Sequence, residues 1–281
     1  MIQLRTMQLD DVSHGYRLSQ QVKWPHRQED WAQALSLGEG LVAETEKGIV
    51  GCAVIWPWEG QHSTLGLVIV DPSCQGQGIG KKLMEGLLEK VPNSNVRLHA
   101  TEMGKGLYEK YGFRVQRPIF QHQTTQLPVI AARQLSVDEK IRPLCEHELS
   151  SLIDNDYQSH GMLRPALWQN LFNSADALLV LEKSGSITGY MVIRKFGRGT
   201  VIGPMLAQDE DSAQTLFCHG ASQLVGQFLR LDTYGNTPFS NWLVEQGLPC
   251  IDAPLIMVKG IPWQRAEQAM QDFSLMSQAM G

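Results

Sequence analysis

The sequence contains no long apolar run, no excess of positive charge and no segment typical of a secretory signal. A membrane-spanning helix needs about 20 mostly apolar residues, so the absence of such a run excludes one. The net charge of −5 argues against nucleic acid as the main partner. A strand pattern already occupies the first residues, where a signal peptide would have to lie. We therefore expect a cytoplasmic protein that binds neither membranes nor nucleic acid.

Paired cysteines are also missing from the sequence. The five cysteines stand singly, without a C-x-x-C pair, and the histidines show no metal-ligand spacing. An odd number of scattered cysteines fits a reducing compartment better than a disulfide-linked secreted fold, and we expect no metal site. The chain does have length and apolar content, because 281 residues with 43% apolar side chains suit two compact domains.

One segment, residues 68–84, joins an apolar strand to an amphipathic helix through a glycine-rich loop. Gly76, Gly78 and Gly80 stand at alternate positions in it. The backbone N–H groups of such a loop converge at the positive end of a helix dipole, which suits a phosphate or pyrophosphate. The spacing G-x-G-x-G is not the G-x-G-x-x-G of dinucleotide folds, and the strand at 96–100 ends without a carboxylate. A nucleotide triphosphate loop would also have a Ser or Thr after its lysine, where this chain has a second lysine.

The segment resembles the Q/R-x-x-G-x-G/A signature of the GCN5-related N-acetyltransferase (GNAT) superfamily, with Gln75, Gly78 and Gly80 at the three named positions. The resemblance implies that the loop amides bind the pyrophosphate of acetyl-coenzyme A. It also implies that the end of the preceding strand binds the pantetheine arm in the manner of a neighbouring strand. The implied cofactor-binding residues are Val68, Ile69, Val70, Gln75, Gly76, Gln77, Gly78, Ile79, Gly80 and Lys81.

A second segment, residues 107–113, resembles the family element L-Y-x-K-x-G-F. The resemblance implies that Tyr108 is the catalytic acid that protonates the departing coenzyme thiolate, and that Tyr111 is its structural partner. A phenol with a pKa near 10 can serve a sulfur leaving group in this way. The alternative for Tyr108 is packing beneath the cofactor. Thr101 and Gly104 stand where the family often has Asn and Ala, so contacts to the cofactor are expected to differ there.

The second half of the chain repeats the pattern of the first. Strand-like runs at 178–183 and 186–192 are similar to those at 41–44 and 48–54, and later elements recur at offsets of about 133 to 138 residues. Concordant offsets over several elements indicate an internal duplication. We therefore predict an α/β fold of two tandem GNAT-like domains, each a mixed, mostly antiparallel sheet flanked by helices.

The predicted domain limits follow from this duplication. Residues 1–127 form the acetyl-CoA-binding domain, residues 128–262 a degenerate GNAT-like domain, and residues 263–281 a helical tail. In the second copy the run Gln208 to Ala213 holds three carboxylates where glycines are needed, and these would repel pyrophosphate. Leu243 stands where Tyr108 stands in the first copy. The second half also resembles the domain attached to GNAT domains in YitH-like bacterial acetyltransferases, which implies that it helps form the acceptor pocket or a pseudo-dimer surface.

The expected reaction is direct attack of a primary amine of a small molecule on acetyl-CoA in a ternary complex. Backbone amides near Ile69 are expected to polarise the thioester carbonyl. Asp232 and Tyr234, at a strand end of the second domain, are the candidates for substrate contact, with turn capping as the alternative for Asp232. Five acidic or histidine side chains lie on segments that can reach the acetyl-CoA site and are candidates for the general base: Glu59, His62, His99, Glu102 and His122. The sequence does not single out one of them.

The sequence leaves two alternative functions open. In the first, the chain is a non-catalytic acyl-CoA sensor. In the second, it is an acetyltransferase that acts on a protein rather than on a small molecule. The intact Tyr108 argues against a sensor, which needs no proton donor. The chain is expected as a monomer whose two domains form a pseudo-dimer, or as a homodimer.

Overall fold

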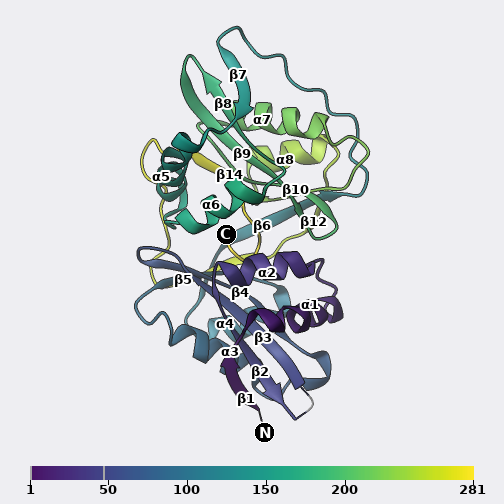
Figure 1. Cartoon of the computed structure of the whole chain (residues 1–281), viewed down its shortest axis with the longest axis vertical. Coiled ribbons are helices and arrows are strands. Elements are labelled where there is room, and N and C mark those ends of the chain that lie inside the picture. Colours follow the sequence, from purple (N-terminus) through teal and green to yellow (C-terminus); the bar gives the residue numbers. More distant parts are fainter. Residues whose placement is uncertain (1, 47) are drawn as a thin grey trace.

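The computed structural model describes residues 2–46 and 48–281 and shows two α/β domains stacked along the long axis of the molecule (Figure 1). The elements of the first domain are β1 (Gln3–Thr6), α1 (Val12–Gln21), α2 (Gln28–Ser36), β2 (Glu39–Thr45), β3 (Gly48–Pro57), β4 (His62–Val70), α3 (Ile79–Leu88), β5 (Asn95–Ala100), α4 (Glu102–Glu109) and β6 (Arg114–Thr124).

The second domain repeats this order of strands and helices. Its elements are β7 (Glu139–Pro143), α5 (Leu149–His160), α6 (Pro165–Ser174), β8 (Ala177–Lys183), β9 (Ser186–Phe196), β10 (Gly199–Ala207), α7 (Glu210–Ser222), β11 (Leu229–Tyr234), α8 (Pro238–Glu245) and β12 (Cys250–Asp252), followed by β13 (Leu255–Lys259) and β14 (Gln271–Ser274). The predicted duplication and mixed α/β class are confirmed. Among the described residues, no helix combines the length and apolar character needed to cross a bilayer.

A continuous sheet runs through both domains, in the strand order β1-β2-β3-β4-β5-β13-β6-β11-β10-β9-β8-β7. Most neighbours are antiparallel, and each domain contains a parallel pair, β4 with β5 and β10 with β11. Strand β12 pairs with β6 and strand β14 with β10, both beside the main path.

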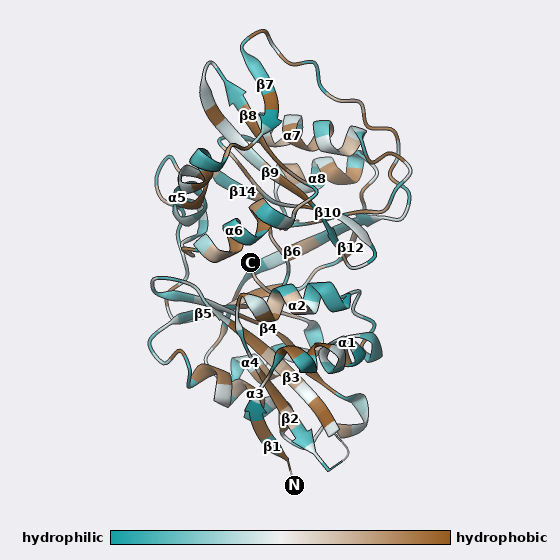
Figure 2. Cartoon of the chain, in the orientation of Figure 1, coloured by the Kyte–Doolittle hydropathy of each residue, from teal (hydrophilic) through white to brown (hydrophobic). Residues whose placement is uncertain are grey.

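The first domain has an apolar core on each face of its sheet. Along β3, Val54 and Trp56 pack into the core beneath α1 and α2, whereas Ala53 and Ile55 pack into the core beneath α3. This alternation follows from the period of two in a strand and gives a strand that is buried on both faces. Figure 2 shows the result, with apolar strands inside and helices whose polar sides face outward.

The domain limits predicted from the sequence do not coincide with the strand pairing. Strand β13, from the second half of the chain, lies between β5 and β6 of the first domain, with Met257 opposite Leu98. Strand β6 pairs with β13 near its start and with β11 of the second domain further along. Each half of the chain therefore contributes a strand to the sheet of the other, because backbone pairing does not depend on order in sequence.

The prediction of a helical tail at 263–281 was wrong. Residues 271–274 form strand β14, and the described part of this region contains no helix. The segment is held by pairing with β10, where Ser274 lies opposite Met205. Tertiary pairing has overridden the local preference for helix, as it does for short segments.

Candidate functional site

Strands β4 and β5 run parallel and then diverge. Their register begins with His62 opposite Asn95 and ends with Leu65 opposite Leu98. Leu67 has a φ of +54° and lies where the β3–β4 register shifts, which marks a bulge that bends β4. Beyond Leu65, no strand of the described chain pairs with the edge of β4 that faces β5. We call the resulting gap between the two strands the splay.

The alternation of strand hydrogen bonds determines which main-chain groups face the splay. The Asp71 N–H donates to the Val50 carbonyl of β3 at 2.8 Å. The Ile69 N–H, two residues earlier in the same register, also faces β3, so the Val70 N–H and C=O face the splay. In agreement, the Gln75 side-chain amide donates to the Val70 carbonyl at 3.4 Å. The sequence predicted that amides near Ile69 face the thioester; in the structure the main-chain N–H that faces the splay is that of Val70, not that of Ile69.

The glycine loop lies at the open end of the splay. Gly76 and Gly78 have φ values of +78° and +75°, and a Cβ on either would meet no atom within 4 Å. Helix α3 makes its first hydrogen bond from the Lys82 N–H to the Gly78 carbonyl, 3.1 Å. The N–H groups of residues 78–81 precede that bond and have no helical acceptor. They present an unobstructed set of donors at the positive helix end, which fits a pyrophosphate.

Tyr108 projects from α4 into the core that also holds α3. Its side chain is 9% exposed and packs edge-on against Phe113, with ring centroids 6.1 Å apart. The preceding Leu107 brings α4 close to the start of α3, since a Cβ on Gly80 would lie 3.5 Å from Leu107 Cδ2. Burial raises the pKa of Tyr108 to about 12. The phenol therefore stays protonated at neutral pH and retains a proton to donate.

Gly104 lies against the Tyr108 ring, and Tyr111 lies just after the end of the same helix. A Cβ on Gly104 would lie 2.9 Å from Tyr108 Cε2, so an alanine at this position would displace the ring. This contact accounts for the glycine where the family often has alanine. The Tyr111 hydroxyl donates to the Lys81 carbonyl at 3.4 Å and so links the end of α4 to the start of α3.

In the second domain the equivalent splay is filled by the chain itself. Strands β10 and β11 pair only at Thr200–Leu229 and Val201–Arg230, and β14 then lies beside β10 where the gap would open. Helix α7 begins with acidic residues, and the Asp209 side chain accepts a hydrogen bond from the Ser212 N–H at 2.8 Å. A peptide strand and a carboxylate cap therefore occupy the region that is open in the first domain.

The turn after α8 reproduces the turn after α4 without its phenol. The Leu248 N–H donates to the Leu243 carbonyl at 3.0 Å, as the Phe113 N–H donates to the Tyr108 carbonyl at 3.2 Å. Leu243 is fully buried. The second copy has kept the backbone geometry and has an apolar side chain in place of the proton donor.

The structure places Asp232 and Tyr234 in contacts within the chain. The Asp232 carboxylate is buried and accepts hydrogen bonds from Arg230 and from the Gln278 side chain, at 2.8 and 2.9 Å. The Tyr234 hydroxyl lies 3.4 Å from the Arg97 guanidinium, and the Arg117 guanidinium lies 3.5 Å from the centre of the Tyr234 ring. Neither side chain points freely toward an open cleft.

Among the candidates for a general base, His99 lies at the splay, directly after Leu98. Its Nδ1 hydrogen bonds with the Gln278 carbonyl at 2.7 Å, and its Nε2 accepts from Arg97 at 3.3 Å. Burial and the neighbouring Arg97 lower the pKa of His99 to about 3, so the imidazole is neutral.

The other candidates for a base are dispersed. His122 is buried and bound through both ring nitrogens to Leu248 and Ser240, at 2.9 Å each. Glu59 and Glu102 are exposed, and His62 packs against the ring of Trp263. In the described part of the chain, no three His, Cys, Asp or Glu side chains gather to hold a metal ion.

Both domains match family models described as acetyltransferase (GNAT) domains, one at residues 36–115 and the other at residues 152–270, which together cover more than half of the chain. The chain belongs to the GNAT superfamily. It is a tandem-domain acetyltransferase, and the open splay, glycine loop and protonated Tyr108 of its first domain fit the acetyl-CoA that enzymes of this fold use.

Three relatives cover nearly the full length of this GNAT chain. The chain is 25% identical to the uncharacterized N-acetyltransferase YitH of Bacillus subtilis, over 97% of this chain and 96% of that protein. A putative acetyltransferase from Pyrococcus horikoshii has a similar fold, with a TM-score of 0.80 at 18% identity, over 100% of this chain and 96% of that one. A tandem GNAT protein from the clavulanic acid biosynthesis pathway superposes with a TM-score of 0.67 at 10% identity, over 92% and 98% of the two chains.

The last seven residues of the chain, 275–281, also lie in this region, and no sequence pattern predicted their position. Residues 275–281, which follow β14, run along the junction of the two domains and contact the splay through Gln278 and Ala279. The two arginines that bind this segment, Arg164 and Arg194, lie on the second domain. No motif marks them, because their contacts join positions that are far apart in the sequence.

Proposed function

We propose that the chain transfers the acetyl group of acetyl-CoA to a primary amine of a small molecule, by direct attack in a ternary complex. One observation supports this most strongly. Val70 of β4 and Leu107 of α4 both lie near Gly80 of the glycine loop, since a Cβ on Gly80 would be 3.8 Å from Val70 Cγ2 and 3.5 Å from Leu107 Cδ2. We infer that one extended ligand can contact all three elements.

In this proposal the main chain binds the donor. The N–H groups of Gln75 to Lys81 bind the pyrophosphate, and the free edge of β4 from Val68 to Val70 pairs with the amides of the pantetheine arm as a strand would. A main-chain N–H of this edge polarises the thioester carbonyl, which is worth on the order of 3 kcal/mol. Holding donor and acceptor together contributes about 7–11 kcal/mol.

Tyr108 then acts as the acid. The neutral amine attacks the acetyl carbon, and a C–N bond forms as the C–S bond breaks. Tyr108 donates its proton to the departing thiolate, and the proton that the amine nitrogen loses returns through water to the Tyr108 phenolate. Gly104 leaves the space that the phenol ring occupies. Asp232 and Tyr234 act on the acceptor side by holding Arg230 and Arg97 rather than by direct contact.

A small acceptor is favoured because the second domain covers the face of the splay opposite α3. The Glu59 N–H donates to the Leu163 carbonyl at 3.1 Å across the junction, and α6 contributes Trp168 and Leu171 to the core beneath α1 and α2. A folded protein would not reach the splay past these contacts, which argues against the alternative of protein acetylation.

The test compares Tyr108→Phe with the matched control Tyr111→Phe, using thiol release from acetyl-CoA with a pooled panel of primary amines. We expect Tyr108→Phe to lower kcat by about 100-fold or more, since general acid catalysis contributes roughly 10² to 10⁴. The acetyl-CoA KM should stay within about threefold. Tyr111→Phe should lose less than about threefold in kcat, because its weak 3.4 Å hydrogen bond is remote from the sulfur.

Equal losses in the two variants would refute the assigned role of Tyr108. Binding of acetyl-CoA by the wild type, without acetylation of any amine in the panel, would favour the sensor. Acetylation of peptide N-termini alone would favour the protein N-acetyltransferase.

A further inference from the structure

Segment 275–281 reaches both strands of the splay on the face opposite α3 and α4. Leu65 and Leu98 point into the α3 core, so their neighbours Gly66 and His99 point to the other face. There, a Cβ on Gly66 would lie 3.0 Å from Cβ of Ala279, and the His99 ring binds the Gln278 carbonyl. If acetyl-CoA enters from the side of α3 and α4, this opposite face is the one from which an amine must approach.

The segment is bound through its main-chain oxygens. Arg164 Nη1 donates to the Gly281 and Met280 carbonyls at 2.9 and 3.3 Å, and Arg194 Nη2 donates to the Met276 carbonyl. The Arg164 guanidinium is itself fixed by Asp156, at 2.8 and 3.0 Å. Both arginines are less than 5% exposed. Contacts of this kind recognise carbonyl groups rather than particular side chains, and any peptide-like ligand can supply them.

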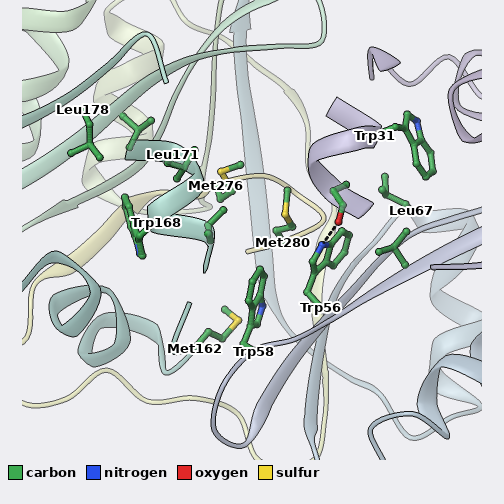
Figure 3. Close-up of a cluster of buried hydrophobic side chains, with 14 of the residues drawn as sticks. Trp31, Trp56, Trp58, Leu67, Met162, Trp168, Leu171, Leu178, Met276 and Met280 are labelled. Carbon is green, nitrogen blue, oxygen red and sulfur yellow. Dashed lines mark hydrogen bonds between the residues drawn. The ribbon is translucent and has the colours of Figure 1, made fainter. Parts of the chain in front are cut away.

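The side chains of the segment fill an apolar space. Met276 and Met280 are buried in a cluster with Trp56, Trp58 and Trp168 from both domains, and Figure 3 shows them within this group. Methionine is unbranched and adapts to irregular space, so a ligand with another apolar group can take its place.

Little space remains at the junction while the segment is bound. The cavity there is lined by His62, His160, Met162 and Trp263, among others, and holds about 20 Å³, which is room for about one water molecule. The larger hollow, of about 460 Å³, is lined by Tyr16, Gln20 and residues 25–29, none of which belongs to the splay. Neither of these two spaces offers an amine room at the splay, and the segment lies where such room would be.

We infer that the junction is a binding channel for a short, apolar, peptide-like amine, and that residues 276–281 occupy it as an internal ligand that the acceptor displaces. This inference rests on the proposed function for the identity of the acceptor. The channel itself is a binding site that can be tested without acetyl transfer.

The first experiment measures binding in the absence of acetyl-CoA. A chain ending at Leu275 is titrated with the N-acetylated peptide Met-Ser-Gln-Ala-Met-Gly, which corresponds to residues 276–281, and binding is followed by calorimetry and tryptophan fluorescence. We expect saturable binding to the shortened chain and at least tenfold weaker binding to the full chain. Absence of binding to a shortened chain that keeps the wild-type circular dichroism spectrum would overturn the inference.

The second experiment measures transfer to methioninamide, an apolar amine with an amide oxygen. The shortened chain should show at least a tenfold higher kcat/KM for methioninamide than the full chain, with the acetyl-CoA KM within twofold, and the peptide should compete with methioninamide but not with acetyl-CoA. An unchanged kcat/KM for methioninamide would count against displacement. If acetyl-CoA binds neither protein, the proposed function fails while the peptide titration still decides the channel.

A point variant covers the case in which the shortened chain does not fold. The full chain with Met276→Ser and Met280→Ser keeps its main chain but loses the two apolar anchors. It should bind the peptide at least tenfold more tightly than the wild type does. The matched control, Leu9→Ser with Val137→Ser at exposed positions, should behave as wild type, and equal peptide binding by both double variants would refute the inference.

Discussion

At the scale of single residues, packing changes the chemistry that the residue type offers. Burial raises the pKa of Tyr108 to about 12, so its phenol is protonated at neutral pH. Gly104 leaves the space that the ring needs. His99 is neutral because desolvation in the folded chain and the neighbouring Arg97 lower its pKa, and its ring hydrogen bonds with the main-chain carbonyl of Gln278. The protonation states at the site are therefore set by burial.

The lowered pKa of His99 predicts an acid-sensitive contribution to stability. The pKa is about 3 in the folded chain against an ordinary value of 6.5, so between these values the unfolded chain binds one more proton. Stability should fall as the pH drops from 6.5, by up to about 1.4 kcal/mol per pH unit, and should not change above pH 7. His99→Gln retains a donor for Gln278 and removes the titration.

Urea unfolding at pH 5.0, 6.0 and 8.0 measures this effect. The His99→Gln variant should lose less stability than the wild type between pH 6.0 and 5.0. His26 has a pKa lowered to about 4 by burial and titrates in both proteins, so the difference between them isolates His99. Identical pH profiles for the two proteins would show that His99 does not make this contribution.

At the scale of elements, the splay forms because β4 separates from β5 before it ends. The bulge at Leu67 turns the strand away from β5, and the loop through Gly76 and Gly78 leads into α3 with its first N–H groups free. The same arrangement in the second domain is closed by β14 and an acidic helix start. Two similar elements therefore differ in function through one added strand and a change of loop residues.

The loop predicts a matched pair of glycine substitutions. Gly78 and Gly185 both have positive φ and open surroundings, but Gly185 lies in the β8–β9 turn of the second domain. An alanine at either position costs about 1–2 kcal/mol of backbone strain. In Gly78→Ala the loop relieves this strain by leaving the conformation that binds the ligand, and restoring that conformation on binding costs about 1.4 kcal/mol. The acetyl-CoA Kd should therefore rise by about tenfold.

Calorimetric titration with acetyl-CoA compares the two variants, and urea unfolding confirms that each is folded. Gly185→Ala should keep the wild-type Kd despite a similar loss of stability. A wild-type Kd for Gly78→Ala would exclude this loop from the binding site.

At the scale of the whole molecule, the two domains are joined by exchanged strands. Met257, from β13, is fully buried in the core of the first domain, in the same cluster as Val96 and Leu98. Because one sheet passes through both domains, we expect them to unfold together rather than one after the other.

Met257→Ala tests this coupling. The substitution should lower the free energy of unfolding by about 2–5 kcal/mol, as large-to-small changes in a core do. It should also weaken acetyl-CoA binding, although the residue belongs to the second half of the chain. The control Ile251→Ala, at an exposed position of β12, should change stability by less than about 0.5 kcal/mol. Separate transitions in circular dichroism and tryptophan fluorescence would contradict the expected single unit.

The sequence by itself determined the family, the duplication, the glycine loop before α3 and the loss of that loop in the second copy. These features depend on residues that are close together, such as the glycines of 76–80 or the acidic run of 209–211, and local spacing is enough to recognise them. The exchange of β13, the strand at 271–274 and the position of segment 275–281 could not be predicted in this way. They depend on which free edges and apolar surfaces meet in space. Only the tertiary structure decided that the open splay lies in the first domain, with the face opposite α3 covered by the chain's own segment.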